Sequence, residues 1–221
     1  MINSAWSQNT NPHLLSNRLE EILNLRNNKS IKNIFLQKSF NKFNKHYQEF
    51  KVKYKDAKWS IQPIRNYKNK SILAINIIAT REIHDQVYTL HSKQKVMVET
   101  DKNKISGYEV INEESILKSQ NSSLEITFVS PENVLTGEKY EVNLIIEKPL
   151  DKSLTASGII ILKNEKNMNI SNVIYGIMPN QSGGLFKYIQ APIQPGIQTI
   201  SAIITHPEGI YSITKKIKVG S

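Results

Sequence analysis

Lysines and aromatic rings are interleaved in the segment KSFNKFNKHYQEFKVKYKDAKW, residues 38–59. It holds seven lysines and six aromatic rings against one glutamate and one aspartate. Proteins that bind single-stranded nucleic acids combine these groups, because amines hold the phosphates while exposed rings stack on the bases. The segment is therefore either an anion-binding surface or the solvent-exposed face of an element whose other face packs in the core.

The spacing of the rings favours the second alternative. If residues 38–55 form a helix, with about 100° between successive residues, the rings share one stripe and most lysines lie on the opposite side. The stripe holds Phe40, Phe43, Tyr47, Phe50 and Tyr54. If FKVKYK is a strand instead, alternation separates Val52 and Tyr54 from the lysines just as well. The candidates for contact with an anionic surface are Lys38, Lys42, Lys45 and Lys53.

Other chemistry-bearing residues form no recognisable constellation. The chain has no cysteine, which excludes thiolate metal sites and cysteine nucleophiles. Its five histidines are scattered without a pair at i, i+4, and no glycine-rich phosphate loop or G-x-S-x-G elbow is present. We expect no metal site, no cofactor and no catalytic residue.

The net charge of +10 belongs to the first half of the chain. Residues 1–120 contain 20 Lys and Arg against 11 Asp and Glu, whereas residues 121–221 contain 9 against 8. No segment approaches the roughly 20 apolar residues that cross a bilayer, so we expect no membrane span. The opening MINSAWSQNTNP shows no signal peptide.

The elements that position these residues change character along the chain. Asn11 and Pro12 form an N-cap and first-turn pair for a helix with apolar residues at helical spacing. From Trp59 the period becomes that of strands, and the short connections at 84–86 and 101–103 predict antiparallel hairpins. The polar stretch NEESILKSQNSS suits a linker, and after it alternating strands and Pro/Gly turns continue to the end.

This order predicts an α+β fold with two domains. We expect a flexible tail at 1–11, an α+β domain at 12–119, a linker at 120–123 and an all-β sandwich at 124–221.

The first half resembles the nuclear transport factor 2-like superfamily. The likeness rests on KWSIQPI, the long hairpin KSILAINIIATREIHDQVYTLHSKQKVMVET and the closing NKISGYEVINEESIL, and covers residues 12–117. The resemblance implies a cone of helices on a curved antiparallel sheet, which encloses a pocket in many members. The pocket-lining candidates are then Tyr47, Trp59, Tyr88, His91 and Tyr108. It also implies a homodimer formed through the exposed sheet face.

The second half resembles immunoglobulin-like sandwich modules, through SPENVLTGEKYEVNLIIEKPL and PGIQTISAIITHPEGIYSITKKIKV. It lacks the cysteine pair and the core tryptophan of antibody domains. Sandwiches of this kind favour a bacterial cell envelope, with the cytoplasm as the alternative. Neither resemblance carries a functional signature by itself.

Three functions fit this pattern. The first is a non-enzymatic binding protein whose cone presents a pocket or surface to a protein partner or a small apolar ligand. The second is a pocket enzyme of the isomerase or dehydratase kind, against which Asp85 and Asp101 fall in turns and Asp56 precedes a strand. The third is a basic adaptor for nucleic acid or an anionic membrane, which the ring spacing disfavours.

Overall fold

The computed structural model describes residues 11–26, 28–67, 69–120, 122–147, 155–162, 176–180, 183–207 and 209–220. The chain divides into two compact units. The first unit comprises residues 1–79 and 93–110, and the second comprises residues 80–92 and 111–221.

Three helices belong to the first unit: α1 (Pro12–Asn24), α2 (Asn28–Ile34) and α3 (Gln37–Lys53). Helix α1 begins as the sequence predicts. Asn11 Oδ1 accepts hydrogen bonds from the backbone N–H groups of His13 (3.0 Å) and Leu14 (3.4 Å), and Pro12 occupies the first turn. Asn11 thus satisfies two donors that would otherwise lack an intrahelical acceptor. Helix α3 confirms the helical alternative for the basic aromatic segment and ends before Tyr54.

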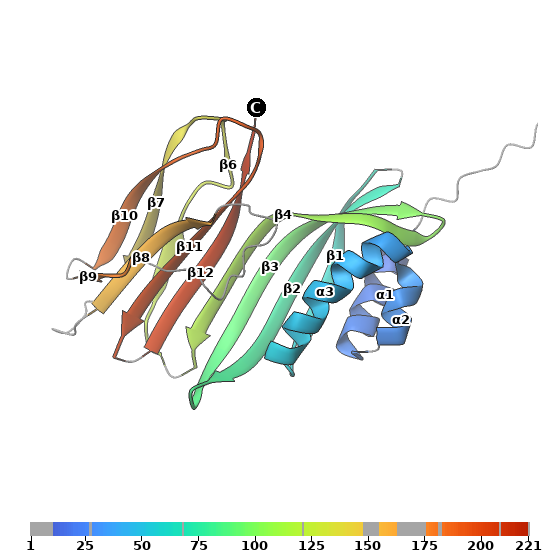
Figure 1. Ribbon diagram of the computed structural model, residues 1–221, viewed down its shortest axis with the longest axis horizontal. Helices are drawn as coiled ribbons and strands as arrows, with labels where there is room; N and C mark the ends of the chain where they lie inside the picture. Colours follow the sequence, from blue (N-terminus) through green and yellow to red (C-terminus); the bar gives the residue numbers. More distant parts are fainter. Residues whose placement is uncertain are drawn as a thin grey trace, which may run out of the picture. The chain divides into compact units, whose positions relative to one another are not determined.

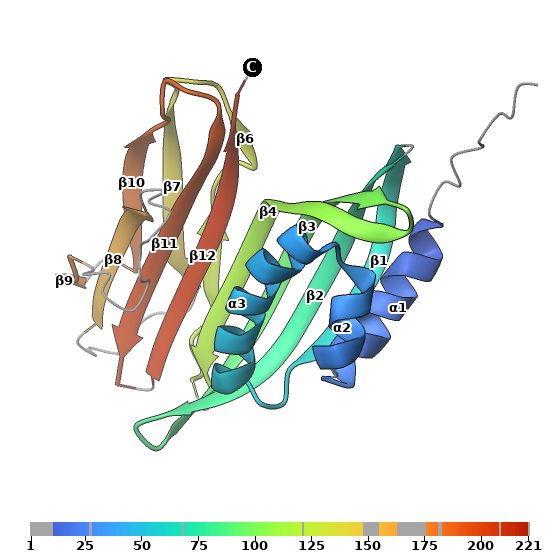
Figure 2. The same cartoon turned by 45° about the vertical axis from the view of Figure 1, so that its right-hand side comes forward.

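Four long strands follow: β1 (Lys58–Tyr67), β2 (Lys70–Ile83), β3 (Gln86–Asp101) and β4 (Lys104–Ser119). The predicted hairpins are confirmed at both short connections. The two-residue turns have positive φ at His84 (47°), Asp85 (62°), Lys102 (48°) and Asn103 (61°). Positive φ at both central residues is what the tightest hairpin turns require. Figures 1 and 2 show the helices of the first unit on one face of its strands.

The second unit contains parts of β2, β3 and β4 and all of the remaining strands. The remaining strands are β5 (Ile126–Val129), β6 (Asn133–Val134), β7 (Lys139–Ile146), β8 (Thr155–Leu162), β9 (Met178–Asn180), β10 (Gly184–Gln190), β11 (Gly196–His206) and β12 (Gly209–Val219). A three-stranded sheet has the order β10-β7-β5. The other sheet has nine strands in the hydrogen-bonded order β1-β2-β3-β4-β12-β11-β8-β9, with β6 beside β12.

The predicted fold class, an N-terminal helical cone plus a separate immunoglobulin-like sandwich, is wrong. A large antiparallel sheet dominates, and its order passes from β4 directly to β12, so strands of both predicted domains share one sheet. In this register Glu113 faces Lys216 and Glu114 faces Lys215, with 2.6 Å between Glu113 Oε2 and Lys216 Nζ. Opposite charges on facing residues stabilise such a pair.

The polar stretch that suits a linker is therefore largely strand, because its residues 112–119 form the end of β4. Alternation of apolar and polar residues indicates that a segment is a strand, but it does not indicate with which other strand the segment pairs. The domain boundaries at 12–119 and 124–221 stay predictions.

The core of the second unit is almost entirely aliphatic. Its buried members come from both sheets and include Val142, Leu144, Ile200, Ile204 and Ile213, together with the two tyrosines Tyr140 and Tyr211. Burying such side chains removes apolar surface from water, which is the main favourable term in folding.

Candidate binding surface on helix α3

Three rings of α3, Phe43, Tyr47 and Phe50, form a continuous array with rings from three neighbouring segments of the first unit. Ring centroids lie 4.8 Å apart for Phe35–Phe43, 5.3 Å for Phe43–Tyr47, 6.5 Å for Tyr47–Trp59, 5.4 Å for Phe50–Trp59 and 4.8 Å for Phe50–Tyr54. Tyr108 of β4 meets Phe35 and Phe43 edge-on at 6.5 and 6.1 Å. Stacked and edge-to-face pairs at these distances are favourable beyond the area they bury.

The first turn of α3 is tied to the start of β4. The Leu36 N–H donates to the Ile105 carbonyl (2.9 Å), and Phe35 forms a parallel bridge with Ile105. The Ser39 hydroxyl lies 2.5 Å from the same carbonyl and 2.9 Å from the Leu36 carbonyl. These bonds place Phe35 and Tyr108 beside Phe43.

The other end of α3 is tied to the end of α1. The Arg26 guanidinium donates to the Tyr54 carbonyl, and Lys51 Nζ donates to the Arg26 carbonyl (3.2 Å). The Asn24 side chain both donates to the Trp59 carbonyl (2.9 Å) and accepts from the Trp59 N–H (2.8 Å). Trp59 is therefore held through its backbone by α1 and through its ring by α3.

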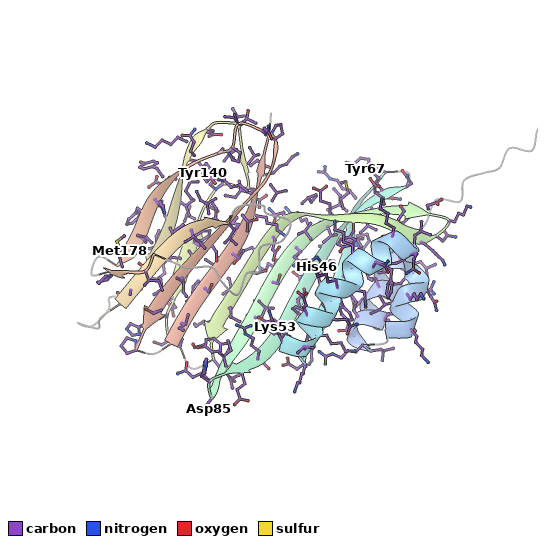
Figure 3. All side chains as sticks on the ribbon, viewed as in Figure 1. His46, Lys53, Tyr67, Asp85, Tyr140 and Met178 are labelled. Carbon is purple, nitrogen blue, oxygen red and sulfur yellow. The ribbon has the colours of Figure 1, made fainter. Side chains whose placement is uncertain are left out.

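The packing of the segment follows the predicted stripe. Tyr47 and Tyr54 are buried at 4% and 8% exposure, and Phe40, Phe43 and Phe50 are partly buried. The four candidate lysines, Lys38, Lys42, Lys45 and Lys53, are exposed. Figure 3 marks His46 and Lys53 along α3.

Lys42 does not point directly away from the rings. Its Nζ lies 5.2 Å from the centroid of the Tyr108 ring, a distance at which an ammonium is attracted to the ring face. This one lysine therefore joins the basic row to the ring array.

The five pocket candidates from the sequence divide into two groups. Tyr47 and Trp59 are neighbours in the array, and Tyr108 joins it through Phe43. In the second unit Tyr88 is buried and donates from its hydroxyl to Gln86 Oε1 (3.1 Å), whereas His91 is exposed. A role for these five residues in ligand binding stays a prediction.

Burial raises the pKa of both tyrosine hydroxyls in the array. For Tyr47 the desolvation by burial raises the pKa, and the positive charge of Arg26 partly opposes it. For Tyr108 burial alone raises the pKa. Both phenols therefore stay protonated at neutral pH, where they are hydrogen-bond donors and acceptors and not anions.

Sequence reasoning missed the groups that hold the array in place. Asn24 and Arg26 act from the end of α1, and Ser39 acts from inside α3. Their partners are backbone atoms distant in sequence, so no local pattern could have identified them. The sequence did give a signal for Phe35, because this residue continues the apolar positions Ile31 and Ile34.

A second cluster of titratable groups lies in the second unit. Lys215 is 8% exposed, donates from Nζ to the Ser130 carbonyl (3.1 Å) and has Glu114 Oε2 3.9 Å away. Burial, and then the negative charge of Glu114, raise the pKa of Tyr211 to about 12. The cluster belongs to the strand pair of β4 and β12, in which Glu114 faces Lys215.

A pocket of about 320 Å³ also lies in the second unit. It is lined by Asn133, Val134, Leu135, Glu138, Lys218 and Gly220. None of these is a candidate from the sequence, and the Glu138 carboxylate already accepts from the Leu135 N–H at 2.6 Å.

Two further classes of site have no support in the described part of the chain. No group of three or more His, Asp or Glu residues is arranged there to hold a metal ion. Nor does any helix among the described residues combine the length and apolar character needed to cross a bilayer.

Comparison with known families finds a match over part of the chain. Residues 121–220 match the model of a domain of unknown function, DUF8623. No curated protein matches the chain. The matched region contains β5 to β12 and leaves the ring array of α3 outside it.

Proposed function

We propose that this protein is a non-enzymatic binding protein that holds an acidic protein partner against the exposed lysines of α3. The observation that carries the proposal is the division of the segment into rings that pack on one another and lysines that face water. Lys38 and Lys53 are 15 residues apart, which spans about 22 Å of a regular helix. A charged row of this length on a firmly packed helix can complement an acidic surface.

Two features favour a protein partner over nucleic acid. Phe35, Phe43 and Tyr47 stack on one another, so nucleic-acid bases would have to displace these stacked rings in order to bind. In addition, the exposed residue Glu49 interrupts the row between Lys45 and Lys53. A carboxylate in the contact repels a uniform polyphosphate, whereas a protein surface with charges of both signs can accommodate it.

The enzyme alternative has weaker support. A pocket enzyme needs a carboxylate and a tyrosine or histidine that converge inside a cavity. Asp56, Asp85 and Asp101 are all exposed, and Figure 3 marks Asp85 at the turn between β2 and β3.

The remaining expectations from the sequence stay predictions. They are the likeness of residues 12–117 to nuclear transport factor 2-like sequences, the likeness of the second half to immunoglobulin-like modules, a homodimer through the N-terminal sheet, and the bacterial cell envelope.

The test compares two charge-reversal variants of equal net charge. The α3 variant is Lys38→Glu, Lys45→Glu and Lys53→Glu, which spares Lys42 and its contact with Tyr108. The control is Lys93→Glu, Lys102→Glu and Lys104→Glu, at exposed positions of β3, the following turn and β4. Binding to fluorescent polyglutamate, to a 20-base-pair DNA duplex and to phosphatidylserine vesicles is measured across a salt titration.

We expect wild-type protein to bind polyglutamate, and the α3 variant to bind it about tenfold more weakly than the control does. If both variants bound polyglutamate equally weakly, the loss would be explained by the net charge of the protein alone, which would contradict the proposal. A site-specific loss of DNA or vesicle binding, without a matching loss for polyglutamate, would replace the acidic protein by nucleic acid or membrane.

A further inference from the structure

Strand β1 lies at the edge of the large sheet. Among the described strands its hydrogen-bonded neighbour is β2, on one side. An edge strand exposes a row of N–H and C=O groups that can pair with a strand from another chain. The groups on the other side of β1 must therefore find partners or remain open to such pairing.

Helix α1 supplies those partners from its last turn. The Asn24 side chain uses its oxygen and its nitrogen together, accepting from the Trp59 N–H at 2.8 Å and donating to the Trp59 carbonyl at 2.9 Å. This is the pair of bonds that the N–H and C=O of one residue in an added antiparallel strand would make. Two residues along β1, the Ile61 N–H donates to Glu20 Oε2 at 2.6 Å.

The next position in the same alternation cannot donate at all. Backbone groups on one side of a strand recur every second residue, so residue 63 follows Trp59 and Ile61. Residue 63 is proline, which has no N–H. The pairing with β2 also shifts register between Pro63 and Arg65, and such irregularities bend a strand and interrupt pairing.

We propose that the last turn of α1 closes β1 against strand addition, and that the strand it excludes is β1 of a second copy of this chain. A second copy fits because antiparallel pairing of two identical edges has two-fold symmetry and needs no other partner. Centred on Ile61, this pairing sets Lys58 opposite Ile64 and Trp59 opposite Pro63, so no like charges face each other. The contact depends on two side chains, Glu20 and Asn24, and substituting them leaves the buried residues Ile22 and Leu23 of the same segment in place.

The test removes the two side chains and keeps a control on the same helix. The variant is Glu20→Ala with Asn24→Ala. The control is Glu21→Ala with Asn17→Ala, which deletes the same side-chain types at exposed positions of α1. A third variant adds Pro63→Val to the first, restoring the missing N–H. Sedimentation velocity over a range of protein concentrations reports self-association, and amide hydrogen exchange reports opening at Trp59 and Ile61.

We expect exchange at Trp59 and Ile61 to be about tenfold faster in the first variant than in the control. We also expect the first variant to dimerise as its concentration rises, the triple variant to dimerise more tightly, and the control to sediment as wild-type protein does. Circular dichroism identifies unfolding, and the milder Asn24→Asp, which keeps the acceptor for the Trp59 N–H, replaces any variant that unfolds.

Two results would overturn the proposal. One is unchanged exchange at Trp59 and Ile61, which would show that these side chains do not protect the edge. The other is faster exchange in variants that sediment as wild-type protein does at every concentration, because the opened edge would then not accept a second copy.

Discussion

The space beside α3 in the first unit and the core of the second unit are filled by different side chains. In the first unit the space beside α3 is filled by flat rings in contact from Phe35 to Tyr54, with Tyr108 at one end. In the second unit two sheets enclose branched aliphatic side chains, most of them almost fully buried. Aliphatic side chains interdigitate in three dimensions and leave few voids. Rings cover a wide area from a single helix, and several of those in α3 remain partly exposed.

Because of this difference, we expect the two regions to respond differently when a side chain is truncated. A closely packed aliphatic core loses contacts on all sides when one member is truncated. Truncating a partly exposed ring leaves a space that is open to solvent, and water can fill that space. The aliphatic core of the second unit should therefore respond more strongly to single truncations than the ring array does, whereas changes in the ring array should act mainly on the surface that carries the lysines.

The largest expected effect comes from truncating the aliphatic core. Leu144 is 0% exposed in β7, and we expect Leu144→Ala to lower the free energy of unfolding by about 3–4 kcal/mol. Phe43→Ala, at a partly exposed ring, should cost about half as much. Urea unfolding monitored by circular dichroism measures both. A greater loss for Phe43→Ala would reverse the comparison between the cores.

The two buried tyrosines of the second unit predict a loss of stability at alkaline pH. Burial raises the pKa of Tyr140 to about 12, and its hydroxyl donates to Gln198 Oε1 at 2.8 Å. Burial and Glu114 raise the pKa of Tyr211 to the same value. The folded state thus keeps protons that the unfolded chain releases near pH 10. The stability that these protons contribute is fully present below pH 10 and is lost as the pH rises toward 12.

Unfolding free energies measured between pH 8.5 and 12 check this expectation. The double variant Tyr140→Phe, Tyr211→Phe should show a shallower decline than wild-type protein, and each single variant should lie between them. An identical decline in the double variant would assign the alkaline loss to other groups.

The smallest expected effect sharpens the description of the ring array. Phe43→Leu keeps a large apolar side chain but removes stacking on Phe35 and Tyr47 and the edge contact with Tyr108. We expect a loss of about 1 kcal/mol beyond the change in buried area. A double-mutant cycle with Tyr47→Leu, measured by urea unfolding, isolates the pair. No coupling in that cycle would mean that the rings act as independent apolar side chains.

Local sequence patterns were sufficient for the elements and for the two sides of α3. Asn11 and Pro12 begin α1, the turns at His84–Asp85 and Lys102–Asn103 join long strands, and the spacing of Phe43 and Tyr47 separates rings from lysines. Each of these features depends on residues within one or two turns of each other, where backbone geometry and side-chain periodicity act directly.

The pairing of distant segments was decided by tertiary structure. The contact of β4 with β12 overturned the predicted division into cone and sandwich, and the contact of Asn24 with Trp59 covered an edge that the sequence does not reveal. A strand shows by alternation that one face is buried, but it can pair with any strand of compatible register and charge. Which one it meets depends on the packing of the whole chain, as does whether its free edge finds a side chain to cover it.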